Sequence, residues 1–482
     1  MWCSLLSIDF SRMSWSFIRD PIYNYIDYNK EVEKKVIDSR AVQRLRWLRQ
    51  LQLAHLVYPG ADHSRFQHSL GVMHLSGLFS SHLASELKRY GLLNDYSVDY
   101  LVEIARLSGL LHDVGHGPFS HAFEEAIYWS KKHSIRDHEE AGYYIVKYSS
   151  IADVLEKHGL LEPVLEILGR EKPSSQQLML IRNTVKEWIY PADVMDFLMR
   201  DSYYTGTREY GIVDYERLIK LSHVDPDNPS TIALEERAYS ALIDYLRSRI
   251  SMFENVYIHP VSAVFSHTIA LVMKRVDEVT GRYSSAIEDL YKGDPSSYLE
   301  LTDYTALLDG LRVAREEGDE ELYRLVDSVL SRRPLWKLLY EERISVSARE
   351  LSGLTASILL KHSMELKKAI EESIKERLTD KGLESYSSSI WVSLSTLKPT
   401  PPVPQGYIQL CRITNGSIAN TRRLDVSELL EREGIKLRVL IRVYGAREIA
   451  KDTRLRNIVE EASRETLVEY ASLKPLFTGI TM

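Results

Sequence analysis

Residues 110 to 121 read Leu110-Leu111-His112-Asp113-Val114-Gly115-His116-Gly117-Pro118-Phe119-Ser120-His121. A mostly apolar run, residues 104–111, leads into this stretch and is predicted to carry His112 and Asp113 on the inner face of a helix. An unpaired carboxylate is costly there, and a divalent metal ion would compensate its charge. Imidazole and carboxylate are good ligands for zinc, iron and manganese. His116 follows His112 by four residues and falls on the same helical face.

Glycine and proline interrupt the chain directly after these side chains. Gly115, Gly117 and Pro118 favour a sharp turn, which would let His121 point back toward the same place. A single histidine is more often a half-buried core residue than a ligand. Three histidines and an aspartate within the ten residues 112–121 favour a metal site instead, and further ligands are expected elsewhere in the chain.

The composition is that of a globular protein. The 482 residues can form a main domain with one or two smaller ones, and 44% hydrophobic with 27% charged residues is ordinary for a folded chain. A net charge of −7 argues against general nucleic-acid binding. Cys3 and Cys411 give neither a disulfide framework nor a cysteine-based zinc site. We find no leader-like start and no run of roughly 18 apolar residues, and we therefore expect a cytoplasmic protein that does not span a membrane.

Helical periodicity dominates the chain, and a mainly α fold with small β elements is predicted. Residues 17–27 are typical of a small hairpin, and residues 190–201 of a helix that carries Asp193. Asp193, Asp196 and Arg200 could form a surface ion-pair ladder. We favour Asp193 as the residue that closes the metal site, because it completes the carboxylates that the histidine cluster needs.

Three domains are expected. Residues 1–280 would form the catalytic core and residues 281–397 a helical extension. The proline-rich residues 398–406 are typical of a stiff connector, and residues 398–482 as a whole would form a small C-terminal α+β lobe.

The motifs resemble a known family. His68, the pair His112-Asp113 and Asp193 match the H…HD…D signature of HD-domain metal phosphohydrolases. Residues 65–72 and 112–121 resemble the deoxynucleoside triphosphate triphosphohydrolase branch, which includes the sterile-alpha-motif HD enzyme. The likeness is strong in the first half of the chain and weak after Tyr257. It implies a helical HD core, a divalent metal (iron, manganese, zinc or magnesium) on those four residues, and hydrolysis of deoxynucleoside triphosphates to deoxynucleoside and inorganic triphosphate.

The resemblance also implies roles for further residues. The metal would lower the pKa of a bound water and so supply the nucleophile. The catalytic set would be His116, His121 and His138 beside the phosphates, with His121 as the general acid, and Asp201 at the 3'-hydroxyl. The substrate-binding set would be Arg65 and Arg249 at the phosphates, Gln50 and Leu51 at the sugar and base, and Tyr257 under the sugar.

The resemblance also bears on how the protein is regulated and which substrate it prefers. Positions matching Asp38 and Arg46 recognise a guanine nucleotide activator in the family, and the family tends to form homo-oligomers. Val194 and Phe197 stand where the sterile-alpha-motif member has a lysine and a tyrosine, so one phosphate contact and one sugar contact are missing.

Two alternatives remain open. One is an HD phosphatase or phosphodiesterase that acts on nucleoside monophosphates or cyclic nucleotides with the same metal. The other is a regulatory module that binds nucleotides or single-stranded nucleic acid. The complete ligand set argues against a mere binding module, and the acidic net charge makes nucleic acid an unfavoured partner.

Overall fold

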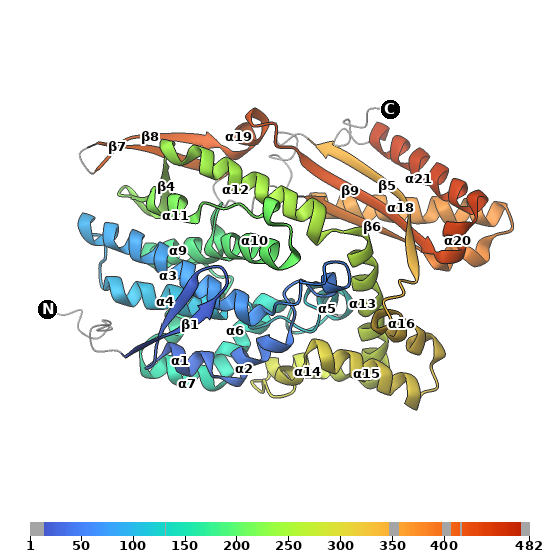
Figure 1. Cartoon of the computed structure of the whole chain (residues 1–482), viewed down its shortest axis with the longest axis horizontal. Coiled ribbons are helices and arrows are strands. Elements are labelled where there is room, and N and C mark those ends of the chain that lie inside the picture. Colours follow the sequence, from blue (N-terminus) through green and yellow to red (C-terminus); the bar gives the residue numbers. More distant parts are fainter. Residues whose placement is uncertain (1–13, 131, 347–355, 398–405, 415–416, 474–482) are drawn as a thin grey trace.

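The computed structural model describes residues 14–130, 132–346, 356–397, 406–414 and 417–473. The described chain is mainly helical with small sheets, which confirms the predicted fold class (Figure 1). The helices are α1 Glu33–Ile37, α2 Arg40–Arg44, α3 Arg65–Tyr90, α4 Val98–Leu111, α5 His121–Phe123, α6 His138–Tyr148, α7 Ser150–Lys157, α8 Leu161–Leu168, α9 Gln176–Arg182, α10 Ala192–Thr205, α11 Tyr215–Lys220, α12 Tyr239–Met252, α13 Pro260–Thr280, α14 Arg282–Tyr291, α15 Asp303–Glu316, α16 Glu320–Leu330, α18 Ala356–Asp380, α19 Val426–Arg432, α20 Arg447–Lys451 and α21 Thr453–Leu473. Three π-helical turns of the described chain, η4 Glu124–Tyr128, η5 Asn183–Glu187 and η8 Phe253–Tyr257, lie between them, as do several short 3-10 turns.

The strands form three sheets. They are β1 Trp15–Asp20, β2 Asn24–Asn29, β3 Ser222–Asp225, β4 Asn228–Glu235, β5 Trp336–Val346, β6 Ile390–Leu397, β7 Tyr407–Thr414, β8 Ser417–Asp425 and β9 Leu437–Ala446. The antiparallel pair β1–β2 is the hairpin that the sequence predicts. The second sheet has the order β3–β4–β7–β8 with a parallel β4–β7 pair, and the third has the order β5–β9–β6 with antiparallel pairs.

Helix α3 is the long helix of the core. A capping box of Ser64 and Gln67 begins it, and Gly91, with a left-handed backbone (φ 70°), ends it. α3 packs along α4 and contacts α10, so the helices that carry the predicted metal ligands lie together in one core.

The hydrophobic cores do not follow the predicted domains. One core joins buried side chains from residues 26–329 with those of residues 408–435, and a second core joins residues 339–392 with residues 439–467. The segment predicted as a helical extension, residues 281–397, is divided between the two cores: its first half packs in the first core, and its second half contains β5 and β6. The predicted C-terminal lobe is likewise divided, with β7 and β8 extending the β3–β4 sheet and β9 lying between β5 and β6. The partner strands lie far apart in the sequence, so local periodicity does not reveal their pairing. Most of the predicted connector lies outside the described residues.

Within the described residues, no single helix is long and apolar enough to cross a membrane. One pair of helical segments, 236–257 and 260–280, meets the length and composition requirement only in combination, and it is bent by 62°.

A buried polar network ties the hairpin to α1 and α4. Arg106 of α4 donates from Nη2 to Glu33 Oε2 over 3.0 Å, and Asn29 Nδ2 donates to both carboxylate oxygens of Glu103 at 3.0 and 3.1 Å. Burial, together with the neighbouring Glu33 carboxylate, raises the pKa of Glu103 to about 8. The folded state therefore holds the Glu103 proton more tightly than the unfolded chain does. The tighter binding of this proton stabilises the folded state below pH 4.5, and that stabilisation is lost as the pH rises toward about 8.

We expect Glu103→Gln to remove this pH dependence, because the amide keeps an acceptor for Asn29 and cannot ionise. The unfolding free energy of the variant should exceed that of the wild type by about 1–3 kcal/mol at pH 8 and approach it at low pH. Urea unfolding followed by circular dichroism between pH 5 and about pH 8 measures the difference. Exposed Glu316→Gln is the matched control, and parallel wild-type and Glu103→Gln curves would contradict the assignment.

Candidate active site and metal centre

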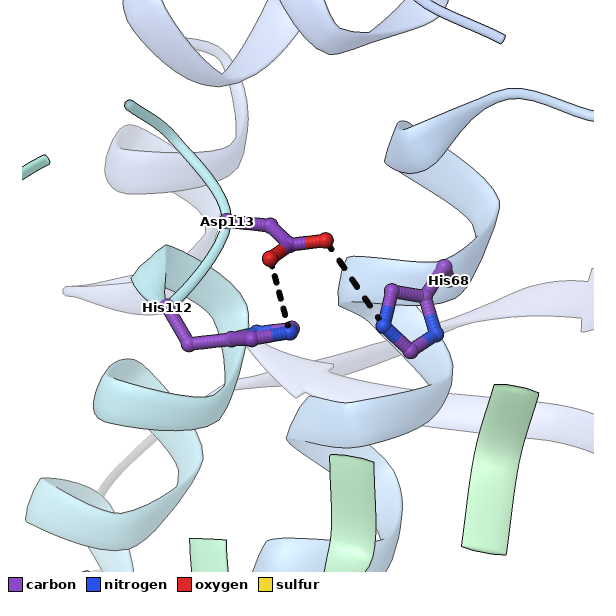
Figure 2. Close-up of side chains that lie close together, drawn as sticks. All are labelled: His68, His112 and Asp113. Carbon is purple, nitrogen blue, oxygen red and sulfur yellow. Dashed lines mark ion pairs between the residues drawn. The ribbon is translucent and has the colours of Figure 1, made fainter. Parts of the chain in front are cut away.

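Four predicted ligands converge where α3, the end of α4 and α10 meet. Figure 2 shows His68 of α3 facing Asp113 and His112, with His68 Nε2 3.8 Å from Asp113 Oδ2 and His112 Nε2 3.3 Å from Asp113 Oδ1. Asp193 Oδ1 of α10 lies 3.1 Å from His68 Nε2 and 3.5 Å from His112 Nε2. Two imidazole nitrogens and two carboxylates thus face one point, an arrangement that suits a divalent transition metal.

The protonation states of these side chains suit the binding of a metal cation. His112 Nδ1 lies 2.8 Å from the Gly109 carbonyl oxygen and donates to it, which leaves a lone pair on Nε2. That buried Nε2 has no hydrogen-bond partner among the described residues. Burial opposes ionisation of Asp193, but the nearby imidazoles of His68 and His112 outweigh burial and hold its pKa well below the usual value. An orphaned imidazole nitrogen beside ionised carboxylates is what a metal ion would satisfy.

Asp196 supports the metal ligands from behind. Its Oδ2 lies 2.8 Å from His68 Nδ1, and Arg200 Nε donates to the same oxygen over 2.9 Å. Arg200 is fully buried and also donates to Asp20 Oδ2 over 2.8 Å, while Tyr23 of the hairpin segment donates to Asp196 Oδ1 over 2.8 Å. The alternative of a surface ladder for Asp196 and Arg200 is therefore wrong. A carboxylate on the second ring nitrogen fixes the orientation of a metal-binding histidine.

Gly71 makes room for this network. A Cβ at Gly71 would lie 1.9 Å from Asp196 Oδ1 and 2.4 Å from Arg200 Nη2, so only glycine permits α3 to approach these side chains.

The three remaining histidines form a row beside the ligands. His116 Nε2 lies 3.3 Å from Asp113 Oδ1, and the His116 ring stacks on that of His138 with 3.8 Å between centroids. Burial and the nearby charge of Arg65 lower the pKa of His116 well below its usual value, so its imidazole is neutral. Asp113, His116 and His138 each place one potential ligand atom within 4.8 Å of the others.

Glu124 joins two of these histidines, and the sequence analysis missed it. One carboxylate oxygen pairs with His138 Nδ1, and Oε2 lies 2.8 Å from His121 Nδ1. The side chain is buried, yet hydrogen bonds with His121 and His138 hold its pKa below the usual range. The three-residue spacing of His121 and Glu124 was the available signal.

The Arg44 side chain holds the loop between α4 and α5 through the loop's backbone carbonyl groups. Arg44 donates to the carbonyl oxygens of Leu301, Val114 and His116 at 2.9, 3.2 and 2.6 Å. A Cβ at Gly115 would lie 2.0 Å from the His138 carbonyl oxygen, so glycine allows α6 to begin against this loop.

Asp303, at the first turn of α15, links two parts of the site. It accepts hydrogen bonds from the Phe119 N–H at 2.7 Å and from the Arg49 N–H at 2.8 Å. Phe119 has φ 53° and Ser120 φ 50°, uncommon values for residues other than glycine, and Asp303 holds this strained backbone. The histidine loop and the segment before Gln50 are thereby fixed to one carboxylate.

A cavity of about 430 Å³ opens next to the ligands. The predicted residues that line it are Gln50, Leu51, Arg65, His68, Asp113, His116, His121, His138, Asp193, Asp201 and Tyr257. His112 faces a smaller adjoining cavity of about 70 Å³ together with Asp113 and Asp193. Three buried polar atoms of this lining, Gln50 Oε1, His116 Nδ1 and Ser262 Oγ, have no hydrogen-bond partner among the described residues. A ligand with polar groups would satisfy them.

Arg65 lies at the end of the cavity nearest the metal ligands. Asp201 also lines the cavity, beside Tyr257. Arg65 Nη1 pairs with Asp113, and Nε donates to Ser120 Oγ over 2.9 Å. Tyr257, the last residue of η8, donates to Asp201 Oδ2 over 2.8 Å, and His63 Nε2 lies 2.8 Å from Asp201 Oδ1. The role of His63 was missed in the sequence, where nothing distinguishes it.

Three predicted residues lie outside the cavity lining. The Arg249 guanidinium is 4.8 Å from the ring centroid of Phe253, which does line the cavity. Asp38 and Arg46 are exposed: Asp38 pairs with Lys34, and the Arg46 guanidinium lies 3.6 Å from the Phe66 ring centroid. The predicted activator role of Asp38 and Arg46 stays a prediction, as do the assigned roles of the cavity residues.

Comparison with known proteins identifies the class. Residues 65–183 match the HD domain family, so this part of the chain is an HD domain, as its motifs predict. The chain is 31% identical over 264 residues to uncharacterized protein YwfO of Bacillus subtilis, which covers 54% of this chain and 56% of that protein.

Further relatives carry the name deoxynucleoside triphosphate triphosphohydrolase. The SAMHD1 homolog of Dictyostelium discoideum is 28% identical over 70% of this chain and 62% of its own length, and human SAMHD1 is 30% identical over 59% and 49%. The chain thus spans about half to three-fifths of the length of these curated relatives. A hypothetical protein from Aquifex aeolicus, solved as a crystal structure, shares the fold, with a TM-score of 0.67 at 24% identity over 93% of this chain and all of that one.

We expect Asp196→Asn to weaken metal binding about 10- to 100-fold, because the amide no longer fixes His68 as a carboxylate does. Isothermal titration with Mn²⁺ measures the affinity. Exposed Asp153→Asn is the control for a lost charge elsewhere. Equal affinities of Asp196→Asn and wild type would contradict the supporting role.

Proposed function

We propose that this protein is a metal-dependent phosphohydrolase that converts deoxynucleoside triphosphates to deoxynucleoside and inorganic triphosphate. The observation that carries the proposal is the convergence of His68, His112, Asp113 and Asp193 beside a cavity of about 430 Å³ with a row of histidines. The named relatives support the substrate class.

The four converging residues would hold the ion. A bound divalent ion would lower the pKa of a coordinated water and polarise a phosphate oxygen. Asp196 and Gly109 orient His68 and His112, so that both imidazoles present Nε2 to the same point.

The phosphates would lie along the histidine row. Arg65 offers a guanidinium to phosphate oxygens, held in place by Asp113 and Ser120. His116, being neutral, can donate one hydrogen bond without repelling Arg65. His121 keeps Nδ1 on Glu124, so Nε2 can deliver a proton to the departing 5'-oxygen. Its side chain is 65% exposed, which allows it to exchange protons with solvent.

The nucleoside would occupy the rest of the cavity. Gln50 and Ser262 offer unsatisfied polar atoms, and Phe197 and Phe253 supply apolar and aromatic lining. Asp201, braced by Tyr257 and His63, retains lone pairs for the 3'-hydroxyl. Tyr257 would pack under the sugar, where it would disfavour a 2'-hydroxyl.

A guanine nucleotide bound at Asp38 and Arg46 is proposed as an activator, with a homo-oligomer as the active form. Arg46 lies on Phe66, which neighbours Arg65 on α3, so a ligand there would contact the helix of the metal ligand His68. Adding GTP or dGTP to the assay below tests this. An unchanged rate with either nucleotide argues against activation.

The reaction is tested by anion-exchange analysis of products after incubation of the protein with Mn²⁺ and each deoxynucleoside triphosphate. Release of intact triphosphate supports the proposal. Turnover of nucleoside monophosphates or cyclic nucleotides without triphosphate release would instead indicate a phosphatase or phosphodiesterase. Binding without any turnover would indicate a regulatory module.

We expect Asp113→Ala to lose at least 10³-fold in turnover, because it removes a ligand and the partner of Arg65. Metal content measured by mass spectrometry should fall by one equivalent per chain. A variant that keeps its metal and its rate would contradict the assigned site.

His121→Asn is expected to lower kcat by about 10² to 10⁴, the usual contribution of a general acid. Glu124→Gln should lower kcat less, because it loosens the hold on His121 Nδ1 but leaves the imidazole in place. Stopped assays with excess substrate measure both effects. His158→Asn, at a histidine outside the cavity, is the control; equal rates for His121→Asn and His158→Asn would exclude His121 as the acid.

A further inference from the structure

A second cluster of histidine and glutamate side chains lies toward the far end of α3. His82 and Glu86 are one helical turn apart on α3, and His223 projects from β3. One ligand atom from each lies within 4.8 Å of the others. His82 follows His68 by 14 residues, which places it about 21 Å along the helix from the first site.

The hydrogen bonds around the cluster resemble the outer contacts of a metal site. His82 Nε2 lies 2.8 Å from the Ser222 carbonyl oxygen, so it donates there and leaves the lone pair on Nδ1. His223 Nε2 lies 2.8 Å from Glu235 Oε1, an arrangement in which Nδ1 is likewise left for a ligand. Metal-binding histidines donate their second N–H to a backbone carbonyl or a carboxylate in this way.

Glu86 completes the set. Its Oε1 is 2.6 Å from His223 Nδ1, and its Oε2 accepts the Val224 N–H over 2.8 Å. The carboxylate is therefore fixed by β3 with one oxygen directed at the imidazole. Glu86 and His223 are buried and His82 is half-buried, so the site is close to the surface and still shielded.

We propose that His82, Glu86 and His223 bind a second divalent transition metal ion of the zinc class. Two imidazoles and one carboxylate are a ligand set that zinc accepts, with a fourth position for water. The ion would cross-link α3 to β3, and Glu235 would connect it to β4 and the parallel strand β7. Its role is structural, because no residue of the cluster lines the cavity of the first site.

The competing arrangement is an imidazolium without metal. His223 lies between Glu86 and Glu235, so a proton on each ring nitrogen would satisfy both carboxylates equally well. In that arrangement His82 contributes nothing to the cluster. The contribution of His82 therefore distinguishes the two.

The first experiment counts zinc. Wild type, His82→Ala and the control His158→Ala are equilibrated with Zn²⁺, freed of excess by gel filtration and measured by mass spectrometry. We expect His82→Ala to hold one equivalent per chain less than the other two. Equal zinc in all three overturns the proposal.

A second experiment separates this site from the first and does not depend on the fold of His82→Ala. Asp113→Ala, which lacks a ligand of the first site, should retain about one zinc ion, and X-ray absorption should show imidazole and carboxylate ligands around it. Glu235→Gln in this background should weaken zinc binding about 10- to 100-fold, because Glu235 orients His223 without being a ligand. Absence of bound zinc in Asp113→Ala, or equal affinity after Glu235→Gln, overturns the proposal.

Discussion

The structure depends on one buried anion. Asp196 is fully buried and lies between the imidazole of His68 and the guanidinium of Arg200. A buried carboxylate without such partners would cost several kcal/mol, so α3, α10 and the N-terminal segment must stay together to satisfy it. The hydrogen bonds of Asp196 therefore orient a metal ligand and also hold the core elements together.

Two of the site's residues reach it through π-helical turns. Glu124 begins the turn η4, and Tyr257 ends the turn η8. A π-turn shifts the following side chains around the helix axis relative to an α-helix, and such turns are frequent at functional sites. In this protein they allow one helix segment to serve both the apolar core and the cavity, since Ile127 and Val256 of the same turns are buried.

The sequence predicted those features whose cause is local. His112, Asp113 and the glycines after them are close in the chain, and their spacing indicated the metal site, with His68 and Asp193 added by motif. The partners that position them were harder to find. Arg44 and Asp303 act on the histidine loop from 70 and 184 residues away, and a lone arginine or aspartate has no pattern that reveals this. The same limit explains why the two hydrophobic cores cross the predicted domain boundaries, because β9 pairs with strands from a region whose charged residues looked helical.

The parallel pairing of β4 with β7 has a consequence for synthesis of the chain. Glu235 of β4 pairs with Cys411 of β7, so the paired residues lie 176 positions apart in the chain. At ribosomal rates of about 5–20 residues per second, one edge of β4 would wait about 9–35 s for its partner. An unpaired edge strand invites pairing with other chains. The HD core can complete its helices during that time, but its sheet remains open until almost the whole chain has emerged.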